Sequence, residues 1–326
     1  LVRQGAMPLI DPRELLPLLR CPRCHGPLAG DDGGLACASS GCGLASRAFP
    51  RVAGLHALVD FEDSVLDEAG LRERAGASGV PRRAARGVAG ALRRWSAPPS
   101  PVAERHMRDL VARLHAEGGR PRVLVVGGGT RNPGSDVLYD DAGLDVIAFD
   151  IYASPEVRFI ADVHGVPLAD GSVQAVSVQA VLEHVLDPWR AVAEIERVLA
   201  PGGLVYAVTP FLQHVHEGAW DFTRFTESGH RWLFRAFERI DSGVVAGPAT
   251  AWVWSTEQLV RGLTRSFAAG KAARVALCWV HLLDRLIPEP HAVDGASCVY
   301  FYGRKGGPRL DPAGVVRSYR GAQRTA

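Results

Sequence analysis

From residue 121 onward, short apolar runs alternate with stretches of helical periodicity. The apolar runs predict strands near 122–127, 145–150, 157–161, 173–178, 203–209, 239–245 and 297–303. The stretches between them predict helices over 134–142, 188–200 and 227–237, with a longer helical insertion around 253–286. Strands that alternate with helices favour a parallel sheet covered on both faces. The pattern therefore predicts an α/β fold whose ligand lies beyond the carboxyl ends of the strands.

The pattern differs on either side of this region. We expect a small module over 1–60, a connector rich in Arg and Ala over 61–103, the large domain over 104–308 with an insertion at 251–290, and a mobile tail over 309–326. Residues 1–6 are expected to precede the natural start at Met7. The connector is interpreted as one or two solvated helices, with a basic patch for RNA as the alternative.

Composition narrows the class of protein only slightly. The 326 residues are 47% hydrophobic and 22% charged, and the net charge of +2 does not by itself indicate nucleic acid. The longest apolar candidate, 275–287, is shorter than a membrane span and contains His281, Asp284 and Arg285. No charged and then apolar leader is seen, so we expect a cytoplasmic protein that does not enter membranes.

Four cysteines are concentrated in the first fifty residues. Cys21 and Cys24 form C-x2-C, and Cys37 and Cys42 form C-x4-C. Two such pairs can place four thiolates around a tetrahedral Zn²⁺ ion in a closed structural site. Two disulfides or vacant thiols remain the alternatives, and His25 is interpreted as a bystander. Two later cysteines are expected to be inert core thiols: Cys278 and Cys298.

The residues around these cysteines resemble a known module. The segments "LLRCPRCHGPL", "LACASSGC" and "SRAFPRVAGLHALVD" resemble the Trm112-like zinc ribbon, and Phe49-Pro50 and Gly54-Leu55 keep its frame. Modules of that family accompany methyltransferases either as a partner protein or as a fused domain. The resemblance therefore implies a methyltransferase on the same chain.

The first predicted strand runs into a glycine turn, "VLVVGGGTRNPG", at 123–134. Gly127, Gly128 and Gly129 leave no Cβ, so the backbone can approach a ligand closely. Asp150 ends the next strand, where a carboxylate can accept hydrogen bonds from both hydroxyls of a ribose. The spacing leaves open whether the adenosine belongs to NAD or to another cofactor.

Residues 120–237 resemble a class I S-adenosylmethionine-dependent methyltransferase of the type 11 group. The match lies in "ADVHGVPLADGSVQAV", "VQAVLEHVLDP" and "EIERVLAPGGLVYAVTP". The resemblance implies a seven-stranded Rossmann-like sheet and S-adenosylmethionine as the cofactor. It also implies a role for each cofactor residue: Gly127 and Gly129 at the methionine end, Asp150 on the ribose, Asp162 and the Val163 amide on the adenine, Gln179 beneath the sulfonium, with Gly128 and Ile151 completing the set. Val125 and Arg131 depart from that family's glycine turn.

The segment after the fifth strand of the large domain, "TPFLQHVHEGAWDFTRFTESG", resembles a pattern in bacterial methyltransferases that act on sugars or secondary metabolites. His216 is a candidate base that Asp221 orients, and Arg224 a candidate for binding an anionic acceptor. Alternatively, Asp221 and Arg224 clamp the loop, or His214 and His216 hold a divalent metal with Asp221. His184, in the Glu183-His184 pair, is a second candidate base, or a residue that packs the pocket.

These patterns favour a methyltransferase that acts on a small-molecule acceptor, with O-methylation of a sugar or natural product as the expected reaction. One alternative is an rRNA guanine methyltransferase whose connector contacts RNA, although nucleic acid is the less favoured partner. Another is a non-catalytic partner protein whose altered glycine turn binds no cofactor. The insertion carries Trp252, Trp254 and Trp279 and is interpreted either as a lid over the acceptor or as a homodimer surface.

Overall fold

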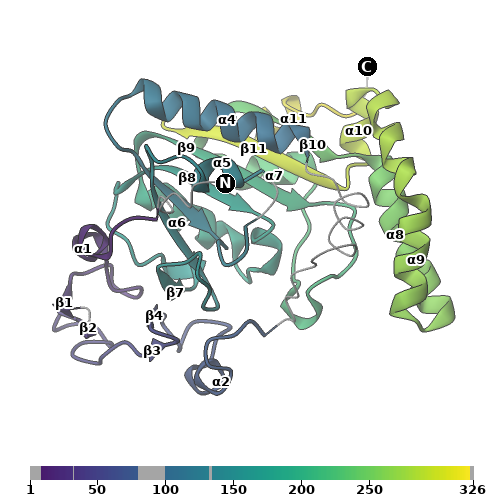
Figure 1. The fold of residues 1–326 in the computed structure, drawn as a ribbon. Coiled ribbons are helices and arrows are strands. Elements are labelled where there is room, and N and C mark those ends of the chain that lie inside the picture. Colours follow the sequence, from purple (N-terminus) through teal and green to yellow (C-terminus); the bar gives the residue numbers. More distant parts are fainter. Residues whose placement is uncertain (1–8, 32, 80–99, 132–133, 324–326) are drawn as a thin grey trace, which may run out of the picture.

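The centre of the molecule is a nine-stranded sheet in the order β10-β11-β9-β8-β5-β6-β7-β4-β3 (Figure 1). The computed structural model describes residues 9–31, 33–79, 100–131 and 134–323. The strands of the sheet are β3 (Arg51–Val52), β4 (Leu55–Leu58), β5 (Arg122–Val126), β6 (Asp145–Asp150), β7 (Phe159–Ala161), β8 (Val173–Gln179), β9 (Leu199–Pro210), β10 (Phe237–Ala246) and β11 (Cys298–Lys305). Each of the seven predicted strands is present, so the predicted α/β fold with a seven-stranded Rossmann-like sheet is confirmed.

The direction of the strands creates a binding edge. The strands from β4 through β9 run parallel, whereas β11 runs antiparallel to both β9 and β10. Since β6 and β8 flank β5 on opposite sides, the chain changes direction across the sheet next to β5. Ligands in such sheets bind outside the carboxyl ends of the strands at this switch point. Gly127 and Asp150 lie at that edge.

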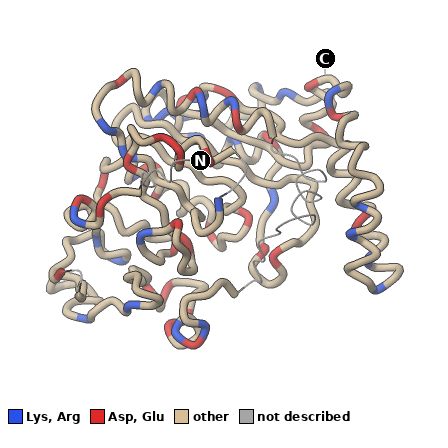
Figure 2. Tube along the Cα trace, viewed as in Figure 1, with Lys and Arg blue, Asp and Glu red and all other residues tan. Residues whose placement is uncertain are grey.

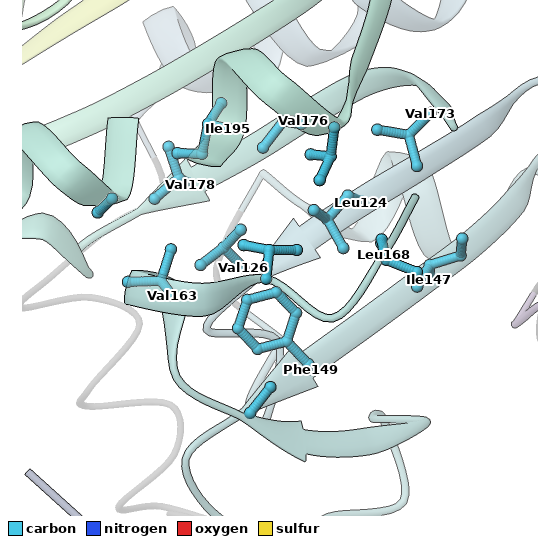
Figure 3. Packing of buried hydrophobic residues seen from close by; sticks show 14 of the residues in the cluster. Leu124, Val126, Ile147, Phe149, Val163, Leu168, Val173, Val176, Val178 and Ile195 are labelled. Carbon is cyan, nitrogen blue, oxygen red and sulfur yellow. The ribbon is translucent and has the colours of Figure 1, made fainter. Parts of the chain in front are cut away.

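Helices cover both faces of the sheet because the strand residues alternate between them. Val123 and Val125 face α4 (Pro101–Ala116) and share one cluster with its Met107 and Leu110. The intervening Leu124 and Val126, with Ile147, Phe149 and others, form the opposite core (Figure 3). The apolar side of α6 (Pro188–Val198) closes this second core through Val192, Ile195 and Val198.

Element boundaries differ from the predicted ones mainly at helix ends. Two helices are shorter than predicted: α5 (Asp136–Tyr139) and α7 (Glu227–Leu233). The strand β9 begins at Leu199 rather than at 203, because Leu199 pairs with Val173 before a register shift that brings Leu204 opposite Ala175. The Pro-Gly-Gly turn therefore forms a bulge inside a strand, and the positive φ of Gly202 permits it.

The N-terminal module is joined to the large domain by backbone pairing and by a common core. It contains α1 (Pro12–Leu15), the hairpin β1 (Leu28–Asp31) and β2 (Gly34–Cys37), and the pair β3 and β4. The strand β4 pairs in parallel with β7, which adds two strands to the sheet. Cys21, Leu35 and Phe49 of the module belong to the same buried cluster as Leu124 of the sheet. The module is therefore part of the folded unit.

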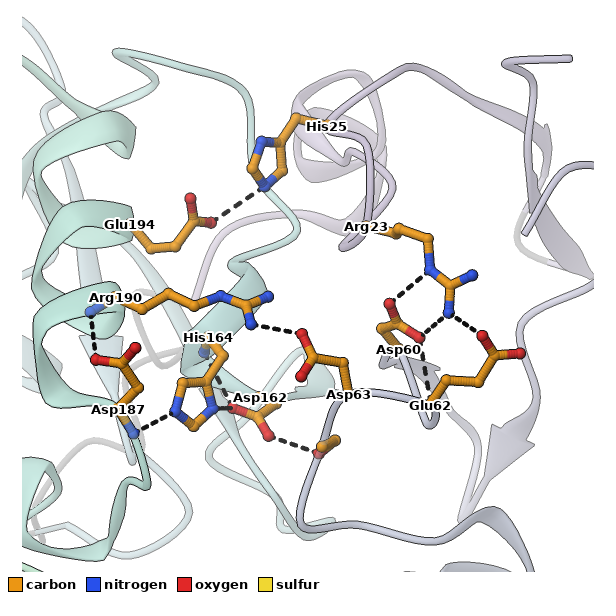
Figure 4. Close-up of polar contacts among 11 residues, drawn as sticks. Arg23, His25, Asp60, Glu62, Asp63, Asp162, His164, Asp187, Arg190 and Glu194 are labelled. Atoms are coloured by element: carbon orange, nitrogen blue, oxygen red, sulfur yellow. Dashed lines mark hydrogen bonds and ion pairs between the residues drawn. The ribbon is translucent and has the colours of Figure 1, made fainter. Parts of the chain in front are cut away.

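Polar contacts also connect the module and the connector to the large domain (Figure 4). His25 lies 3.3 Å from Glu194 of α6, so it faces the large domain rather than the cysteines. Arg190 of α6 contacts Asp63, and Ser64 donates a hydrogen bond to Asp162. The short helix α2 (Glu68–Glu73) follows, with Leu71 buried. The first part of the connector is thus packed against the domain, whereas 80–99 lie outside the described residues.

The insertion and the tail lie beside the last strands. The long pair α8 (Pro248–Thr264) and α9 (Phe267–Leu277) stands at the right of Figure 1 and continues into a 3₁₀ segment, Cys278–Leu286, and α10 (Glu289–Asp294). The expected mobile tail instead contains α11 (Pro312–Arg317). Tyr319 donates to Asp294, and Arg320 donates to the carbonyl of Ser242, so these side chains attach the described part of the tail to the domain.

Acidic and basic residues are mixed along the described chain (Figure 2). Many of them form short-range pairs, as Glu104 with Arg108 and Asp109 with Arg113 do along α4. Among the described helices, none combines the length and the apolar character needed to cross a membrane. The arginine-rich part of the connector, on which the RNA interpretation depends, lies within the segment outside the described residues.

Candidate functional site

A cavity of about 270 Å³ opens at the carboxyl ends of β5, β6, β7 and β8. Gly127, Asp150, Asp162 and His184 line it, and each follows or ends a different strand. The wall opposite the sheet comes from the connector, including Leu66 and residues 77–79. The cavity thus lies between the sheet edge and the connector.

The glycine turn approaches its neighbours too closely for side chains. Gly127 has φ +71°, and a Cβ there would lie 2.4 Å from Val181 Cγ2. At Gly129 a Cβ would meet the Tyr152 ring at 2.5 Å. Of the three glycines, Gly127 lines the cavity, whereas Gly128 and Gly129 do not. Gly128 instead pairs its N–H with the Phe149 carbonyl at 2.9 Å.

Asp150 ends β6 with its carboxylate fixed on both sides. Oδ2 accepts a hydrogen bond from Gly129 N at 2.9 Å, and Oδ1 accepts one from Ile151 N at 2.7 Å. A carboxylate oxygen can accept more than one hydrogen bond, so both can also receive a ligand hydroxyl. Asp150 and Ile151 both line the cavity, which agrees with their predicted placement.

Asp162 and Val163 line the cavity at the end of β7. Oδ1 of Asp162 accepts from the His164 backbone N–H at 3.0 Å and from its Nδ1 at 2.7 Å, while Oδ2 accepts from Ser64. Burial opposes the charged form, but the His164 and Ser64 hydrogen bonds lower the pKa of Asp162 below its ordinary value. His164 thus occupies both lone pairs of Oδ1. Oδ2 accepts one hydrogen bond from Ser64 and can accept one more.

Gln179 does not line the main cavity. It is buried, donates from Nε2 to Ser177 Oγ at 3.1 Å, and borders a separate small void with Val125 and Tyr139. The adjoining Ala180 and Val181 line the cavity in its place. At the end of β8 the residue that borders the cavity is therefore Ala180 and not Gln179.

Arg131, the departure in the glycine turn, makes contacts with the protein itself. Its Nε donates to Glu156 Oε2 at 3.0 Å, and its guanidinium lies 4.8 Å from the Tyr139 ring centroid. Val125 points into the core on the α4 face. Both departures therefore sit outside the cavity wall and leave Gly127 able to border a ligand.

Two histidines and a buried carboxylate lie close together beside the cavity. His184 and His216 line it, with ring centroids 5.0 Å apart. Glu183 lies behind them, with Oε1 3.8 Å from His184 Nε2 and 3.9 Å from His216 Nε2. Burial raises the pKa of Glu183 to about 8 and lowers that of His184. His214, by contrast, lies 3.3 Å from Ser255 and outside this cluster.

Asp221 and Arg224 support the loop that carries His216. Asp221 Oδ2 accepts from the His216 backbone N–H at 2.9 Å and lies 3.3 Å from its Nδ1. Burial disfavours the charged form of Asp221, but the hydrogen bonds from Arg224 and His216 lower its pKa to about 2. Arg224 also donates to three carbonyls, those of Gln213, His214 and Thr223, and does not line the cavity. This geometry matches the loop clamp rather than binding of an anionic acceptor.

The four N-terminal cysteines converge as the spacing predicts. Sγ of Cys21 lies 3.9 Å from that of Cys42, and Sγ of Cys24 lies 3.6 Å from that of Cys37. Tetrahedral zinc with Zn–S bonds of ~2.3 Å separates its sulfurs by about 3.8 Å. The four sulfurs lie within 4.8 Å of one another, and the four thiols are free. The cluster is compatible with a zinc ion.

Some residues of the cavity were not predicted from sequence. Val65 and Leu66 belong to the connector, and Trp220 and Glu217 belong to the loop after β9. The sequence signal for the loop residues was their position beside His216. The connector carried no comparable signal, because the approach of Ser64 to Asp162 depends on how β4 pairs with β7.

Part of the chain around the cavity is similar to known proteins. Residues 135–207 match the family described as a methyltransferase domain. The demethylmenaquinone methyltransferase of Renibacterium salmoninarum is 35% identical over 167 residues, which cover 48% of this chain and 65% of that protein. The enzyme of the same name from Paenarthrobacter aurescens is 32% identical over 148 residues, covering 42% and 54% respectively. The chain thus spans less than two thirds of either relative.

A solved structure of phosphoethanolamine N-methyltransferase 2 from Haemonchus contortus with S-adenosyl-L-methionine aligns with a TM-score of 0.44 at 14% identity, covering 67% of this chain and 57% of that one. The family match lies on the helices and strands that carry Asp150 and Asp162 to the cavity. The family match and the α/β sheet together support a class I S-adenosylmethionine-dependent methyltransferase domain in this chain.

Proposed function

We propose that this protein transfers the methyl group of S-adenosylmethionine to a hydroxyl oxygen of a small molecule, such as a sugar or a natural product. The observation that carries the proposal is a single cavity that is lined both by Asp150 and Asp162 at the sheet edge and by His184 and His216. The first pair suits the adenosine of a cofactor, and the second pair suits proton transfer. The acceptor would meet the methyl group between them.

Gly127, Asp150 and Asp162 support the cofactor part of this proposal. Gly127 lets the backbone border the methionine part, Asp150 is placed to accept the ribose hydroxyls, and Asp162 lines the cavity and can accept from the adenine amino group. Leu66 and Val163 supply apolar surface for the ring. Bound there, the cofactor supplies a methyl group on a positively charged sulfur.

The chemistry of the acceptor end rests on His216. Its Nδ1 faces Asp221 and the His214 carbonyl, both of them acceptors, so the proton sits on Nδ1 and Nε2 keeps its lone pair. Nε2 takes the hydroxyl proton while the methyl carbon bonds to the acceptor oxygen. The carbon–sulfur bond breaks, and its electron pair stays on sulfur. Orienting the reactants contributes most of the rate, since effective molarities reach about 10⁵–10⁸ M.

A demethylmenaquinone-type acceptor is a second candidate, because two relatives carry that name. Trp220, Val181 and Val185 give the cavity apolar walls that suit a ring. Mass analysis of products from S-adenosylmethionine with panels of sugars, hydroxylated aromatic compounds and demethylmenaquinone analogues separates the two. A product from only the last class would replace the first proposal.

We also propose that Cys21, Cys24, Cys37 and Cys42 hold a structural zinc ion. The sulfur separations carry this proposal, together with hydrogen bonds from Gly26 N to Cys24 Sγ and from Leu44 N to Cys42 Sγ, each 3.4 Å. Such a closed site has no open position for catalysis. The module would then hold the start of the connector over the cavity, through Asp63 and Ser64.

Replacing Asp150 tests the cofactor site. We expect Asp150→Ala to raise the Kd for S-adenosylmethionine about 10–100-fold, because a hydrogen bond to a charged group contributes about 1.5–3 kcal/mol. Calorimetric titration with the cofactor measures this. Asp150→Asn keeps one acceptor oxygen for the Gly129 or Ile151 N–H and should lie between the two proteins. Equal affinity in all three would remove the ribose role, and no saturable heat for the unaltered protein would favour the non-catalytic partner.

A further inference from the structure

We propose that Glu183, His184 and His216 bind one divalent transition-metal ion at the acceptor end of the cavity. The candidate ligand atoms are a carboxylate oxygen of Glu183 and Nε2 of each histidine, and they lie within 4.8 Å of one another. Two imidazoles and one carboxylate are the ligand set of several catalytic zinc sites and of open iron(II) sites. This set differs from the His214, His216 and Asp221 combination considered from sequence.

The distances are close to those of a bound ion. Oε1 of Glu183 lies 3.8 Å from His184 Nε2 and 3.9 Å from His216 Nε2. Ligands held tetrahedrally at ~2.0–2.2 Å from zinc are about 3.4 Å apart. Both separations exceed this spacing by only about half an ångström. His216 lies on the loop after β9, where a movement of that size requires no change in the sheet.

Burial of Glu183 is the second observation that points to an ion. Its side chain is 1% exposed, and Oε2 has no hydrogen-bond partner among the described residues. A buried polar group that is left unpaired destabilises the fold, and a charged one does so more strongly. Its backbone carbonyl accepts hydrogen bonds from Phe222 and Thr223, which hold the loop against the carboxylate. A cation beside the two histidines would compensate this buried acid.

The two imidazole rings are already oriented as ligands. Nδ1 of His184 donates to the Trp220 carbonyl at 2.6 Å, so Nε2 carries the lone pair and faces Glu183. Nδ1 of His216 faces the Asp221 carboxylate, which Arg224 holds in place. Metal-binding histidines almost always donate their other N–H to a carbonyl or a carboxylate in this way. Asp221 is therefore a positioning residue of the site.

The open side of the ion would face the acceptor. Both histidines line the cavity, so remaining coordination positions point into it. If the proposed methyl transfer is correct, the acceptor hydroxyl would bind there, lose its proton to solvent at a lowered pKa and attack the methyl group as an alkoxide. His216 would then serve as a ligand instead of a base.

Zinc counting on the full-length protein tests the site. Protein is dialysed against buffered Zn²⁺ and analysed for bound metal per chain, and S-adenosylmethionine binding is measured by calorimetry on the same samples. We expect two zinc ions in the unaltered protein and one in both His216→Ala and Glu183→Gln. His214→Ala is the matched control, because that residue lies on the same loop outside the cluster, and it should retain two. Asp221→Asn should weaken the second site about 10–100-fold.

The outcomes distinguish this inference from the proposed function. Cofactor binding with a single zinc in the unaltered protein, or two zinc ions retained in His216→Ala, overturns the metal site and leaves the methyl transfer standing. Two zinc ions that fall to one in His216→Ala, without any cofactor binding, support the metal site and overturn the methyl transfer. Unchanged cofactor affinity in His216→Ala confirms that this variant is folded.

Discussion

Replacing His216 by alanine is expected to lower kcat roughly 10²–10⁴-fold while the Kd for S-adenosylmethionine stays unchanged, because a positioned base contributes about that factor. The residue lines the same cavity as Asp150 and Asp162 but is not one of the residues proposed to bind the cofactor, so we expect its loss to leave the cofactor contacts in place. Turnover of the acceptor found by the product screen, measured at saturating cofactor, gives kcat. Calorimetry gives the Kd.

His214→Ala provides the matched comparison for this variant. His214 is also an exposed histidine of the loop after β9, but its Nε2 faces Ser255. We expect its kcat to stay near that of the unaltered protein. Equal losses in the two variants would mean that the loop, rather than the imidazole of His216, is what the reaction needs. Unaltered turnover in His216→Ala would remove this residue from the mechanism.

Removal of the zinc ion proposed for the four N-terminal cysteines is expected to unfold the module and to weaken cofactor binding. Zinc binding contributes roughly 10–16 kcal/mol in small zinc peptides, which is comparable with the whole stability of an ordinary domain, about 5–15 kcal/mol. The hydrogen bond from Ser64 to Asp162 would then be lost, and connector residues such as Leu66 would leave the cavity wall. Thermal melting and hydrogen exchange before and after chelation measure the first effect, and calorimetry measures the second.

The chelation experiment is best performed on His216→Ala, so that metal leaves only the cysteine site. Reaction with a thiol reagent should show four newly accessible thiols once the zinc is lost, and re-addition of zinc should restore the melting profile. A melting profile that does not change after verified loss of metal contradicts the zinc assignment. Cysteines that stay unreactive until a reductant is added would indicate the disulfide alternative.

The sequence allowed the sheet and the cofactor edge to be predicted because local signals specify them. The apolar runs that end at Val126, Asp150 and Gln179 are long enough to identify buried strands, and their ends must meet at one edge of a parallel sheet. Asp150 and Gly127 followed from this rule. Gln179 was predicted at the same edge but does not line the cavity. Side chains at a strand end alternate in direction, and here the next residue, Ala180, lines it.

Other features depend on contacts between segments far apart in the chain. No pattern in the connector predicts that Ser64 contacts Asp162, because the two residues are 98 positions apart in the chain. The cluster of Glu183 with His216 likewise depends on the turn of the loop after β9, which Arg224 holds through the Gln213 and His214 carbonyls. From sequence, Arg224 was as good a candidate for binding an acceptor as for supporting the loop.

The pairing of β4 with β7 also affects whether two molecules of this protein can associate through the edges of their sheets. A sheet that stopped at β7 would expose a row of unpaired N–H and C=O groups to which a second chain could add. In the structure β4 occupies that border, and the border then passes to the two-residue strand β3. A strand this short offers little for another chain to pair with. Cutting the protein before residue 100 would uncover β7, and aggregation is the expected result.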